Sequence, residues 1–153
     1  MKKYLVIGNP IEHSLSPKLH NYWLNKNKID GNYDKKLLTD EKVGEFLKSN
    51  QKISGINVTV PFKKTVLNHC TELTELASIS QSVNTIIFSN EKIIGDNTDI
   101  YGFEQSLKDL NFDGLNKTAF ILGAGGVVSS VVIALNNLGV KNIVISNRTK
   151  NKA

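Results

Sequence analysis

A strand that runs into a glycine turn and then into a helix constrains the fold of this chain most. The run is Ala119-Phe120-Ile121-Leu122-Gly123-Ala124-Gly125-Gly126, and an apolar helix is expected from Val127 to Leu138. This is the context that a dinucleotide-binding fingerprint requires, because Gly123 permits a tight turn, Gly125 lets the backbone approach a pyrophosphate, and the helix N-terminus presents free N–H groups. An ordinary strand–turn–helix unit that merely favours glycine is the alternative.

The next expected strand, Asn142 to Ser146, ends at Asn147-Arg148-Thr149. Proteins that bind NAD carry an acidic residue near this point, which bonds the ribose 2′-hydroxyl. Here Arg148 takes its place, and a guanidinium can pair with a 2′-phosphate. Thr149 and Lys150 add a hydroxyl and a second cation. The sequence therefore predicts NADP rather than NAD, with an ordinary surface arginine as the alternative.

The rest of the chain alternates short apolar strands with helices, which predicts an α/β fold with mostly parallel sheets. Further strands are expected at Leu5–Ile7, Tyr33–Leu38, Gly55–Val60, Val83–Phe88 and Lys92–Gly95, the last two forming a hairpin. Further helices are expected at Lys18–Lys28, from Thr39 to Asn50, at Phe62–Ile79 and at Thr98–Leu110. The polar segment 111–116 is the best candidate for a linker.

Composition argues against several classes of protein. The formal net charge is +5 and the pI about 9.3. The lysines are scattered among asparagines and acids, whereas a nucleic-acid footprint needs cations gathered on one face. The single cysteine, Cys70, excludes an intrachain disulfide framework and gives no metal cluster. No signal peptide and no membrane-spanning run is expected, so we predict a cytoplasmic protein that binds neither nucleic acid, membrane nor metal.

Polar clusters follow the expected strands in the N-terminal two thirds of the chain. They are Ser14-Leu15-Ser16-Pro17, Asn57-Val58-Thr59-Val60-Pro61-Phe62-Lys63, Asn84-Thr85 and Gly95-Asp96-Asn97-Thr98-Asp99. Ligands of α/β proteins bind at the ends of strands, and two hydroxyls at a helix start can bond a carboxylate. Taken singly, each cluster has an ordinary structural alternative, such as an N-cap serine, a solvated Lys63 or a helix-capping Asp99.

Taken together, these clusters resemble the shikimate dehydrogenase family. The matching motifs, in the order and spacing of the family, are Asn9-Pro10-Ile11 with His13-Ser14-Leu15-Ser16-Pro17, Asn57 to Lys63, Val83-Asn84-Thr85, Gly95 to Asp99, Gly123 to Gly126, and Asn147-Arg148-Thr149. The resemblance implies a three-layer α/β substrate domain over residues 1–101. The first part of a Rossmann-like NADP-binding domain would follow over residues 102–153, incomplete at its C-terminus.

The resemblance also implies roles in substrate binding. Ser14 and Ser16 would hold the carboxylate of shikimate. Thr59, Asn84 and Asp99 would bind its ring hydroxyls. Lys63 and Asp99 would flank the hydroxyl that is oxidised, as the catalytic pair. The expected reaction is the reversible, NADP-dependent reduction of 3-dehydroshikimate to shikimate on the way to aromatic amino acids.

For the cofactor, the resemblance implies two groups of contacts and, as a weaker inference, a single further residue. Gly123, Ala124, Gly125, Gly126 and Val127 would bind the pyrophosphate. The adenosine 2′-phosphate end would lie against Asn147, Arg148, Thr149, Lys150, Asn151 and Lys152. Glu75 falls where the family has an acidic residue near the cofactor.

Three departures from the family pattern are visible. Val128 stands where glycine or alanine lets the helix pack closely, and Ile100 where glycine is usual. Gln81-Ser82 stand where small residues are usual. The chain also ends after the second expected strand of the cofactor domain, so we expect it to bind NADP poorly and to turn over little by itself, as a monomer or homodimer.

Three other functions stay open on the sequence alone. A quinate/shikimate dehydrogenase that prefers NAD is the nearest, and cofactor preference would decide it. A non-catalytic shikimate-binding module would show saturable binding without turnover. A nucleic-acid binder would show affinity for DNA that falls steeply with salt.

Overall fold

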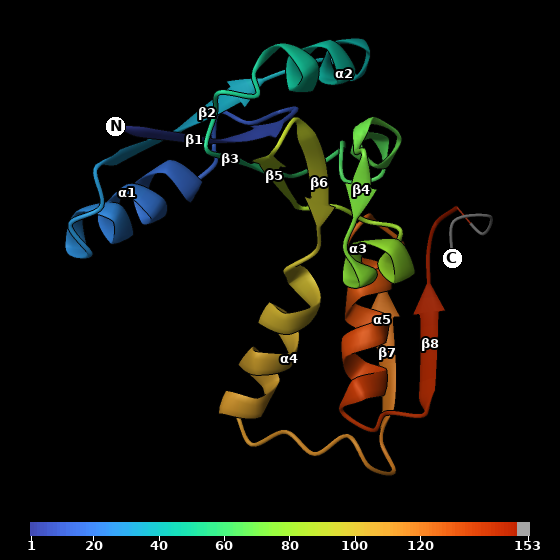
Figure 1. Cartoon of the computed structure of the whole chain (residues 1–153). Coiled ribbons are helices and arrows are strands. Elements are labelled where there is room, and N and C mark those ends of the chain that lie inside the picture. The colour runs from blue at the N-terminus through green and yellow to red at the C-terminus, as the bar shows by residue number, and fades with distance from the viewer. Residues whose placement is uncertain (150–153) are drawn as a thin grey trace.

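The computed structural model describes residues 1–149. Its N-terminal part contains β1 (Lys2–Gly8), α1 (Ser16–Lys26), β2 (Gly31–Leu37), α2 (Asp40–Ser49), β3 (Gly55–Val58), the short 3-10 helix η1 (Thr65–His69), β4 (Glu72–Leu73), α3 (Glu75–Ser80), β5 (Thr85–Ser89) and β6 (Lys92–Asp96). The C-terminal part contains α4 (Asp99–Asp109), β7 (Thr118–Leu122), α5 (Val128–Asn137) and β8 (Asn142–Ser146), and Figure 1 shows it below the first part.

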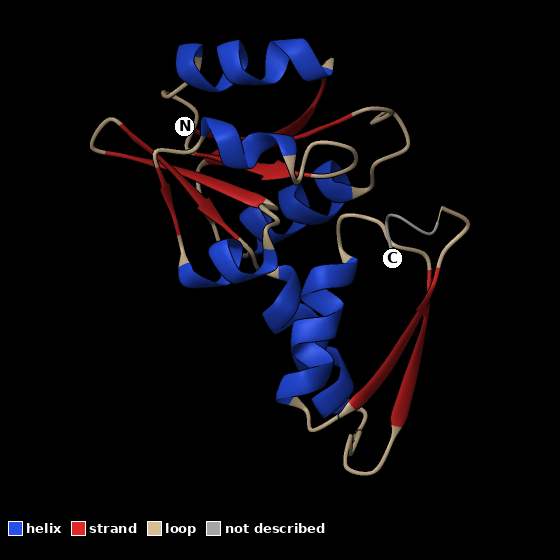
Figure 2. Cartoon of the chain, turned by 90° about the vertical axis from the view of Figure 1, so that its right-hand side faces the viewer, coloured by secondary structure: helices blue, strands red, loops and turns tan. Residues whose placement is uncertain are grey.

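The N-terminal part is a sheet between two layers of helices (Figure 2). The six strands lie in the order β2-β1-β3-β5-β6-β4, with β1 parallel to both β2 and β3 and β5 antiparallel to β3 and β6. The main core joins one face of the sheet to α2, η1 and α3, through side chains such as Ile7, Leu47, Ile56, Val66 and Ala77. Burial of these apolar groups is the main stabilising contribution.

The opposite face of the sheet is covered by α1. A second apolar cluster there contains Val6, Ile11 and Tyr33, with Leu24 of α1 packed against it. Asn21 fastens the helix to β2, because its amide donates to the carbonyl of Tyr33 at 2.8 Å and its oxygen accepts the Tyr33 N–H at 2.9 Å. The predicted α/β fold with a three-layer N-terminal part is confirmed.

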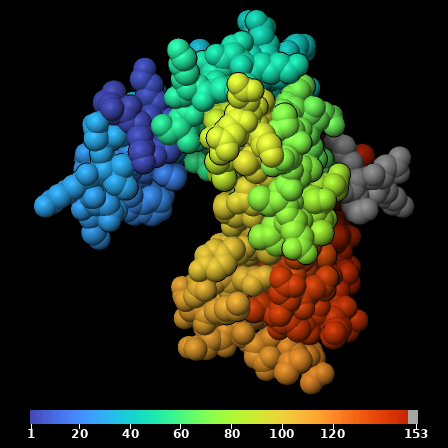
Figure 3. Space-filling model, viewed as in Figure 1, coloured from blue at the N-terminus to red at the C-terminus, as the bar shows by residue number. Residues whose placement is uncertain are grey.

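The C-terminal part is a strand–helix–strand unit. β7 and β8 are parallel, and α5 connects them. α4 leaves the first sheet and packs along α5, as Figure 1 shows. In the space-filling view the green and yellow segments of the N-terminal part lie directly on the orange and red C-terminal part (Figure 3). The predicted boundary between 1–101 and 102–153 falls within α4, and the division stays a prediction.

The helix predicted from Phe62 to Ile79 is wrong. The segment forms η1, the two-residue strand β4 and α3. The chain leaves the helical path because it pairs with β6: the Thr71 N–H donates to the carbonyl of Ile93 at 2.8 Å and the Thr74 N–H to that of Gly95 at 2.9 Å. The Thr74 hydroxyl then accepts the Ala77 N–H and caps α3.

Within residues 1–149, the helices are all too short or too polar to cross a bilayer.

His20 packs between α1 and the sheet. Its ring stacks on Tyr33 at 4.1 Å between centroids and meets Trp23 edge-on. Burial lowers the pKa of His20, because desolvation disfavours the imidazolium. The unfolded chain therefore takes up this proton more readily than the folded chain, so stability is complete above about pH 6.5 and is lost as the pH falls below it.

We expect the free energy of unfolding, measured in urea, to rise between about pH 5 and pH 7. His20→Phe keeps the ring stack and removes the titrating group. The rise should be smaller in this variant than in the wild type. Equal pH profiles for the two proteins would show that His20 does not contribute.

Candidate functional site

The polar clusters of the sequence meet at one edge of the six-stranded sheet. β1 and β3 are parallel and end there, while the antiparallel β5 begins there and β6 ends there. The register places Asn57 beside Thr85 and Thr85 beside Asp96, and the Val58 N–H donates to the carbonyl of Asn84 at 2.7 Å. Segments that are distant in sequence therefore present their polar side chains together.

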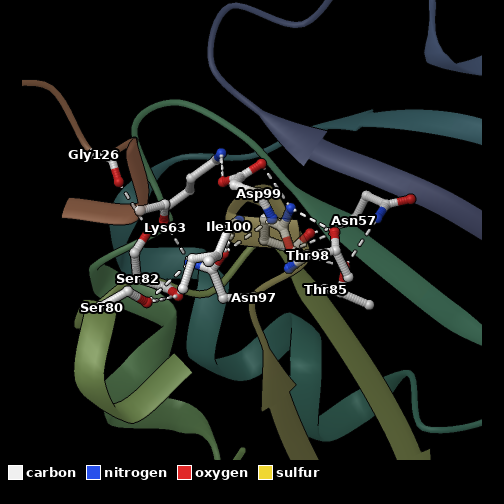
Figure 4. A network of polar contacts seen from close by, with 12 residues as sticks. Asn57, Lys63, Ser80, Ser82, Thr85, Asn97, Thr98, Asp99, Ile100 and Gly126 are labelled. Atoms are coloured by element: carbon white, nitrogen blue, oxygen red, sulfur yellow. Dashed lines mark hydrogen bonds and ion pairs between the residues drawn. The ribbon is translucent and has the colours of Figure 1, made fainter. Parts of the chain in front are cut away.

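Lys63 and Asp99 form the centre of the site. Lys63 lies in the turn after β3, and Asp99 is the first residue of α4. The Lys63 Nζ lies 2.6 Å from the Asp99 Oδ2, and the two side chains are 14% and 23% exposed. Figure 4 shows the two groups pointing toward each other across the edge of the sheet. The predicted pair is thus a close, largely desolvated ion pair that solvent still reaches.

Asn84 holds the other carboxylate oxygen. Its Nδ2 donates to the Asp99 Oδ1 at 2.9 Å, so both oxygens of Asp99 have a partner. The Asn84 Oδ1 accepts the Thr98 N–H at 3.0 Å, and because a backbone N–H can only donate, this contact fixes which way the amide faces. The structure thus brings Asn84 and Asp99 together, while their predicted role in binding ring hydroxyls stays a prediction.

Three further residues that the sequence did not assign extend this network. The Thr85 hydroxyl donates to the Asn84 Oδ1 at 3.0 Å and accepts from the Asn57 Nδ2 at 3.3 Å. The hydroxyl of Tyr33 donates to the Asn57 Oδ1 at 2.7 Å. Burial raises the pKa of Tyr33 well above its usual range, so its hydroxyl keeps its proton and continues to donate. In the sequence, Asn57 and Thr85 stood within the polar clusters without a role of their own, and Tyr33 stood in an expected strand.

Ser14, Ser16 and Thr59 lie at the same sheet edge. The Ser14 Oγ accepts the Ser16 N–H at 3.3 Å, just after β1, and both serines are half-buried. Thr59 follows β3 and lies against Gly8, where an added Cβ would come within 2.6 Å of the threonine methyl. No direct hydrogen bond joins these three side chains to Lys63 or Asp99 in the described part of the chain.

The glycine turn lies next to Lys63. The hydroxyl of Ser82 donates to the carbonyl of Gly126 at 2.8 Å, and a Cβ built on Gly126 would lie 3.7 Å from the Lys63 Cβ. Gly123 has φ of +103°, which favours glycine, and Cβ atoms built on Gly123 or Gly125 would meet open space. The backbone of the turn is therefore accessible to a ligand beside the ion pair.

The other predicted cofactor residues lie around this turn or outside the description. Ala124 is half-buried within it, and Val127, the residue before α5, is 43% exposed. Asn147 follows β8 and donates to the carbonyl of Thr149 at 2.7 Å, and Arg148 is exposed. Glu75 is the first residue of α3, which packs beside α5. Lys150, Asn151 and Lys152 lie outside the described residues.

A separate pocket of about 310 Å³ lies on the α1 face of the sheet. Its walls include Tyr4, Leu24 and Ile86, and it borders the polar network through Asn57 and Thr85. Neither Lys63 nor Asp99 lines it, so we place the chemical site at the sheet edge. Among residues 1–149, no group of three or more histidine, cysteine or carboxylate side chains is arranged to hold a metal ion.

Comparison with known proteins points to one family. Residues 6–86 match the family described as the shikimate dehydrogenase substrate binding domain. The chain is 54% identical to the shikimate dehydrogenase (NADP(+)) of Pelagibacter ubique, covering 99% of this chain and 58% of that protein. It is 43% identical to the enzyme of the same name from Acinetobacter baumannii strain SDF, covering 99% of this chain and 59% of that protein.

Solved structures give the same result. The shikimate dehydrogenase of Aquifex aeolicus superposes with a TM-score of 0.93 at 36% identity, covering 99% of this chain and 57% of that one. The Thermus thermophilus enzyme in complex with NADP(H) and shikimate superposes with a TM-score of 0.91 at 31% identity, covering 100% and 58%. The chain thus spans somewhat under three fifths of the length of these relatives. By profile, sequence and fold, it belongs to the shikimate dehydrogenase substrate binding domain family.

Proposed function

We propose that this chain carries the substrate site and the first part of the cofactor site of an NADP-dependent shikimate dehydrogenase. The reaction is the reversible reduction of 3-dehydroshikimate to shikimate, in the biosynthesis of aromatic amino acids. The observation that carries the proposal is the Lys63–Asp99 ion pair at 2.6 Å, lying beside an accessible glycine turn. An alcohol dehydrogenase needs such a proton-transfer group next to a nicotinamide.

Two sets of side chains hold the substrate at the sheet edge, one for its carboxylate and one for its ring hydroxyls. The hydroxyls of Ser14 and Ser16 hold the carboxylate at one end of the site. Thr59, Asn84 and Asp99 bind the ring hydroxyls. The chain of hydrogen bonds from Tyr33 through Asn57 and Thr85 keeps the Asn84 amide in place. A small polyhydroxylated acid suits this set of short, fixed polar groups.

The Lys63–Asp99 pair manages the proton of the reacting hydroxyl. In the direction of oxidation the pair takes up this proton as the carbonyl forms. In the direction of reduction the Lys63 ammonium stabilises negative charge that develops on the oxygen, and the pair returns a proton to it. Asp99 keeps the ammonium in position through the 2.6 Å contact, and Asn84 keeps Asp99 in position.

The residues around the glycine turn fit a dinucleotide. The positive φ of Gly123, the open space at Gly123 and Gly125, and the start of α5 suit a pyrophosphate. Gly123, Ala124, Gly125, Gly126 and Val127 would hold that group, and Asn147, Arg148 and Thr149 the 2′-phosphate end. Glu75, Lys150, Asn151 and Lys152 complete the proposed contacts. When bound, NADP accepts or supplies the hydride.

The proposal is tested by turnover. The completed chain is this sequence followed by the part of the Pelagibacter ubique relative that extends beyond the match. We expect it to form NADPH from NADP and shikimate, as measured by near-ultraviolet absorbance. A folded completed chain that binds shikimate without any turnover would favour a non-catalytic binding module, and one that does neither would contradict the proposal.

Arg148 should set the preference for NADP. A guanidinium–phosphate pair is charge-assisted and disappears when either partner is removed. In the completed chain, Arg148→Ala should raise the KM for NADP about ten- to a hundredfold and leave the KM for NAD within about twofold. Lys141→Ala, which removes another exposed cation, serves as the control. Equal losses with both cofactors would show that Arg148 does not contact the 2′-phosphate.

The proposal places the protein in the cytoplasm as a monomer or homodimer, with the small-molecule substrate and NADP as its partners. The half-buried Cys70 is the only cysteine of the sequence, and burial raises the pKa of its thiol to about 11. A single cysteine can form no intrachain disulfide, which is typical of proteins in a reducing compartment. Sedimentation equilibrium of the completed chain distinguishes the two oligomeric states.

A further inference from the structure

Asn97 is a buried polar residue that the proposed chemistry does not use. It lies between β6 and α4, two residues before Asp99, and is 1% exposed. A buried amide costs free energy unless its donors and acceptor are paired. Figure 4 shows Asn97 below the Lys63–Asp99 pair, among side chains and backbone from different segments.

The carbonyl oxygen of Asn97 faces the start of α4. Its Oδ1 accepts the N–H of Asp99 at 3.0 Å and that of Ile100 at 3.4 Å. Backbone N–H groups only donate, so the amide cannot be turned over without losing both contacts. Asn97 therefore caps the first turn of α4 and fixes the backbone that carries the Asp99 carboxylate.

The amide nitrogen of Asn97 is anchored in the opposite direction. Its Nδ2 lies 2.8 Å from the carbonyl of Ser82, 2.9 Å from the Ser80 Oγ and 2.9 Å from the Ser130 Oγ. Ser130 is fully buried on α5, the helix that follows the glycine turn, and the Ser82 hydroxyl binds Gly126 in that turn. One side chain thus joins the backbone of Asp99 to the segments around the glycine turn.

We infer that Asn97 is a positioning residue for the Lys63–Asp99 pair, which sets the place of the Asp99 carboxylate relative to the glycine turn. The inference rests on the proposed function. Asn84 and Lys63 hold the two carboxylate oxygens, whereas Asn97 holds the main chain from which the carboxylate extends. Without Asn97 the Asp99 side chain is chemically unchanged, but the main chain from which it extends loses this anchor.

The test uses the 153-residue chain and two ligands, shikimate and its analogue without the C-3 hydroxyl. Calorimetry gives the ratio of their dissociation constants, which measures the contribution of the reacting hydroxyl alone. We expect the wild type to prefer shikimate about tenfold, as one well-placed hydrogen bond to a charged group would give. A ratio near one in the wild type would overturn the proposed function together with this inference.

In Asn97→Ala we expect the ratio to fall to about one, while the affinity for the analogue stays within about twofold. Asn97→Ser keeps a short acceptor for the Asp99 N–H and loses the amide donors, so it should restore a ratio of about threefold. Asn50→Ala, which removes an asparagine that bonds only the backbone of α2, should keep the wild-type ratio.

A positioning role and a purely structural role give different results. If Asn97→Ala weakens both ligands equally, or leaves the ratio of the wild type, the inference is wrong and Asn97 serves the fold alone. If Asn97→Ala does not fold, Asn97→Ser decides: a ratio near threefold supports the inference, and the full wild-type ratio overturns it.

Discussion

Replacing Lys63 by methionine in the completed chain is expected to lower kcat for shikimate oxidation about a thousandfold. Methionine approximates the length of the side chain and removes the ammonium, so the reacting hydroxyl loses its proton-transfer partner and the developing charge loses its stabilisation. The Asp99 carboxylate, now without the cation at 2.6 Å, remains at the site. Shikimate should still bind, since the contacts of Ser14, Ser16 and Thr59 are retained.

Lys64→Met is the matched control for this prediction. Lys64 is the next residue along the chain, so its sequence neighbours are nearly those of Lys63. Its side chain, however, is exposed. Its kcat should stay within about twofold of the wild type, as is usual for surface substitutions. A Lys63→Met enzyme that keeps more than about a tenth of the activity would show that another group handles the proton.

Phe62→Ala is expected to lower the free energy of unfolding by about 3 to 5 kcal/mol, because it removes a large buried aromatic side chain and leaves a cavity. Phe62 is 1% exposed and belongs to the main core. Phe62 is the neighbour of Lys63 in the turn after β3, and its backbone bonds to Thr59 and Val66 are available to alanine as well, so the variant tests the side chain alone.

The control for the packing effect is Val60→Ala. Val60 lies in the same turn and is 64% exposed, so this variant removes apolar atoms that are not packed in the core. Urea unfolding at constant pH should show a loss below about 0.5 kcal/mol for this variant. Similar losses for Phe62→Ala and Val60→Ala would contradict the view that the Lys63 turn is anchored by the core.

The parts of the fold that depend on local pattern could be predicted from the sequence. β7, the glycine turn, α5 and β8 follow from apolar runs and from Gly123, whose positive φ few other residues tolerate. The family motifs likewise indicated Lys63, Asp99 and Asn84, which the structure joins directly. Residue types at strand ends alone left an ordinary structural alternative open for each of these residues, and the resemblance to the family supplied their roles.

The parts that depend on pairing between distant segments could not be predicted. Glu72 and Leu73 form a strand only because β6 lies beside them, and the local sequence reads equally well as helix. Asn97 stood within a recognised motif, yet its role follows from Ser82 and Ser130, whose positions only the tertiary fold fixes. The same holds for Tyr33, whose hydroxyl reaches Asn57 across the sheet.

We expect shikimate to bind at the sheet edge formed by the ends of β1, β3 and β6 and the start of β5. The most direct test is a titration of the chain with shikimate, followed by the NMR signals of the backbone amides. We predict saturable shifts at Ser14, Ser16, Thr59, Asn84 and Asp99. Shifts confined to the walls of the pocket on the α1 face, such as Tyr4, Leu24 and Ile86, or no shifts at all, would contradict the account.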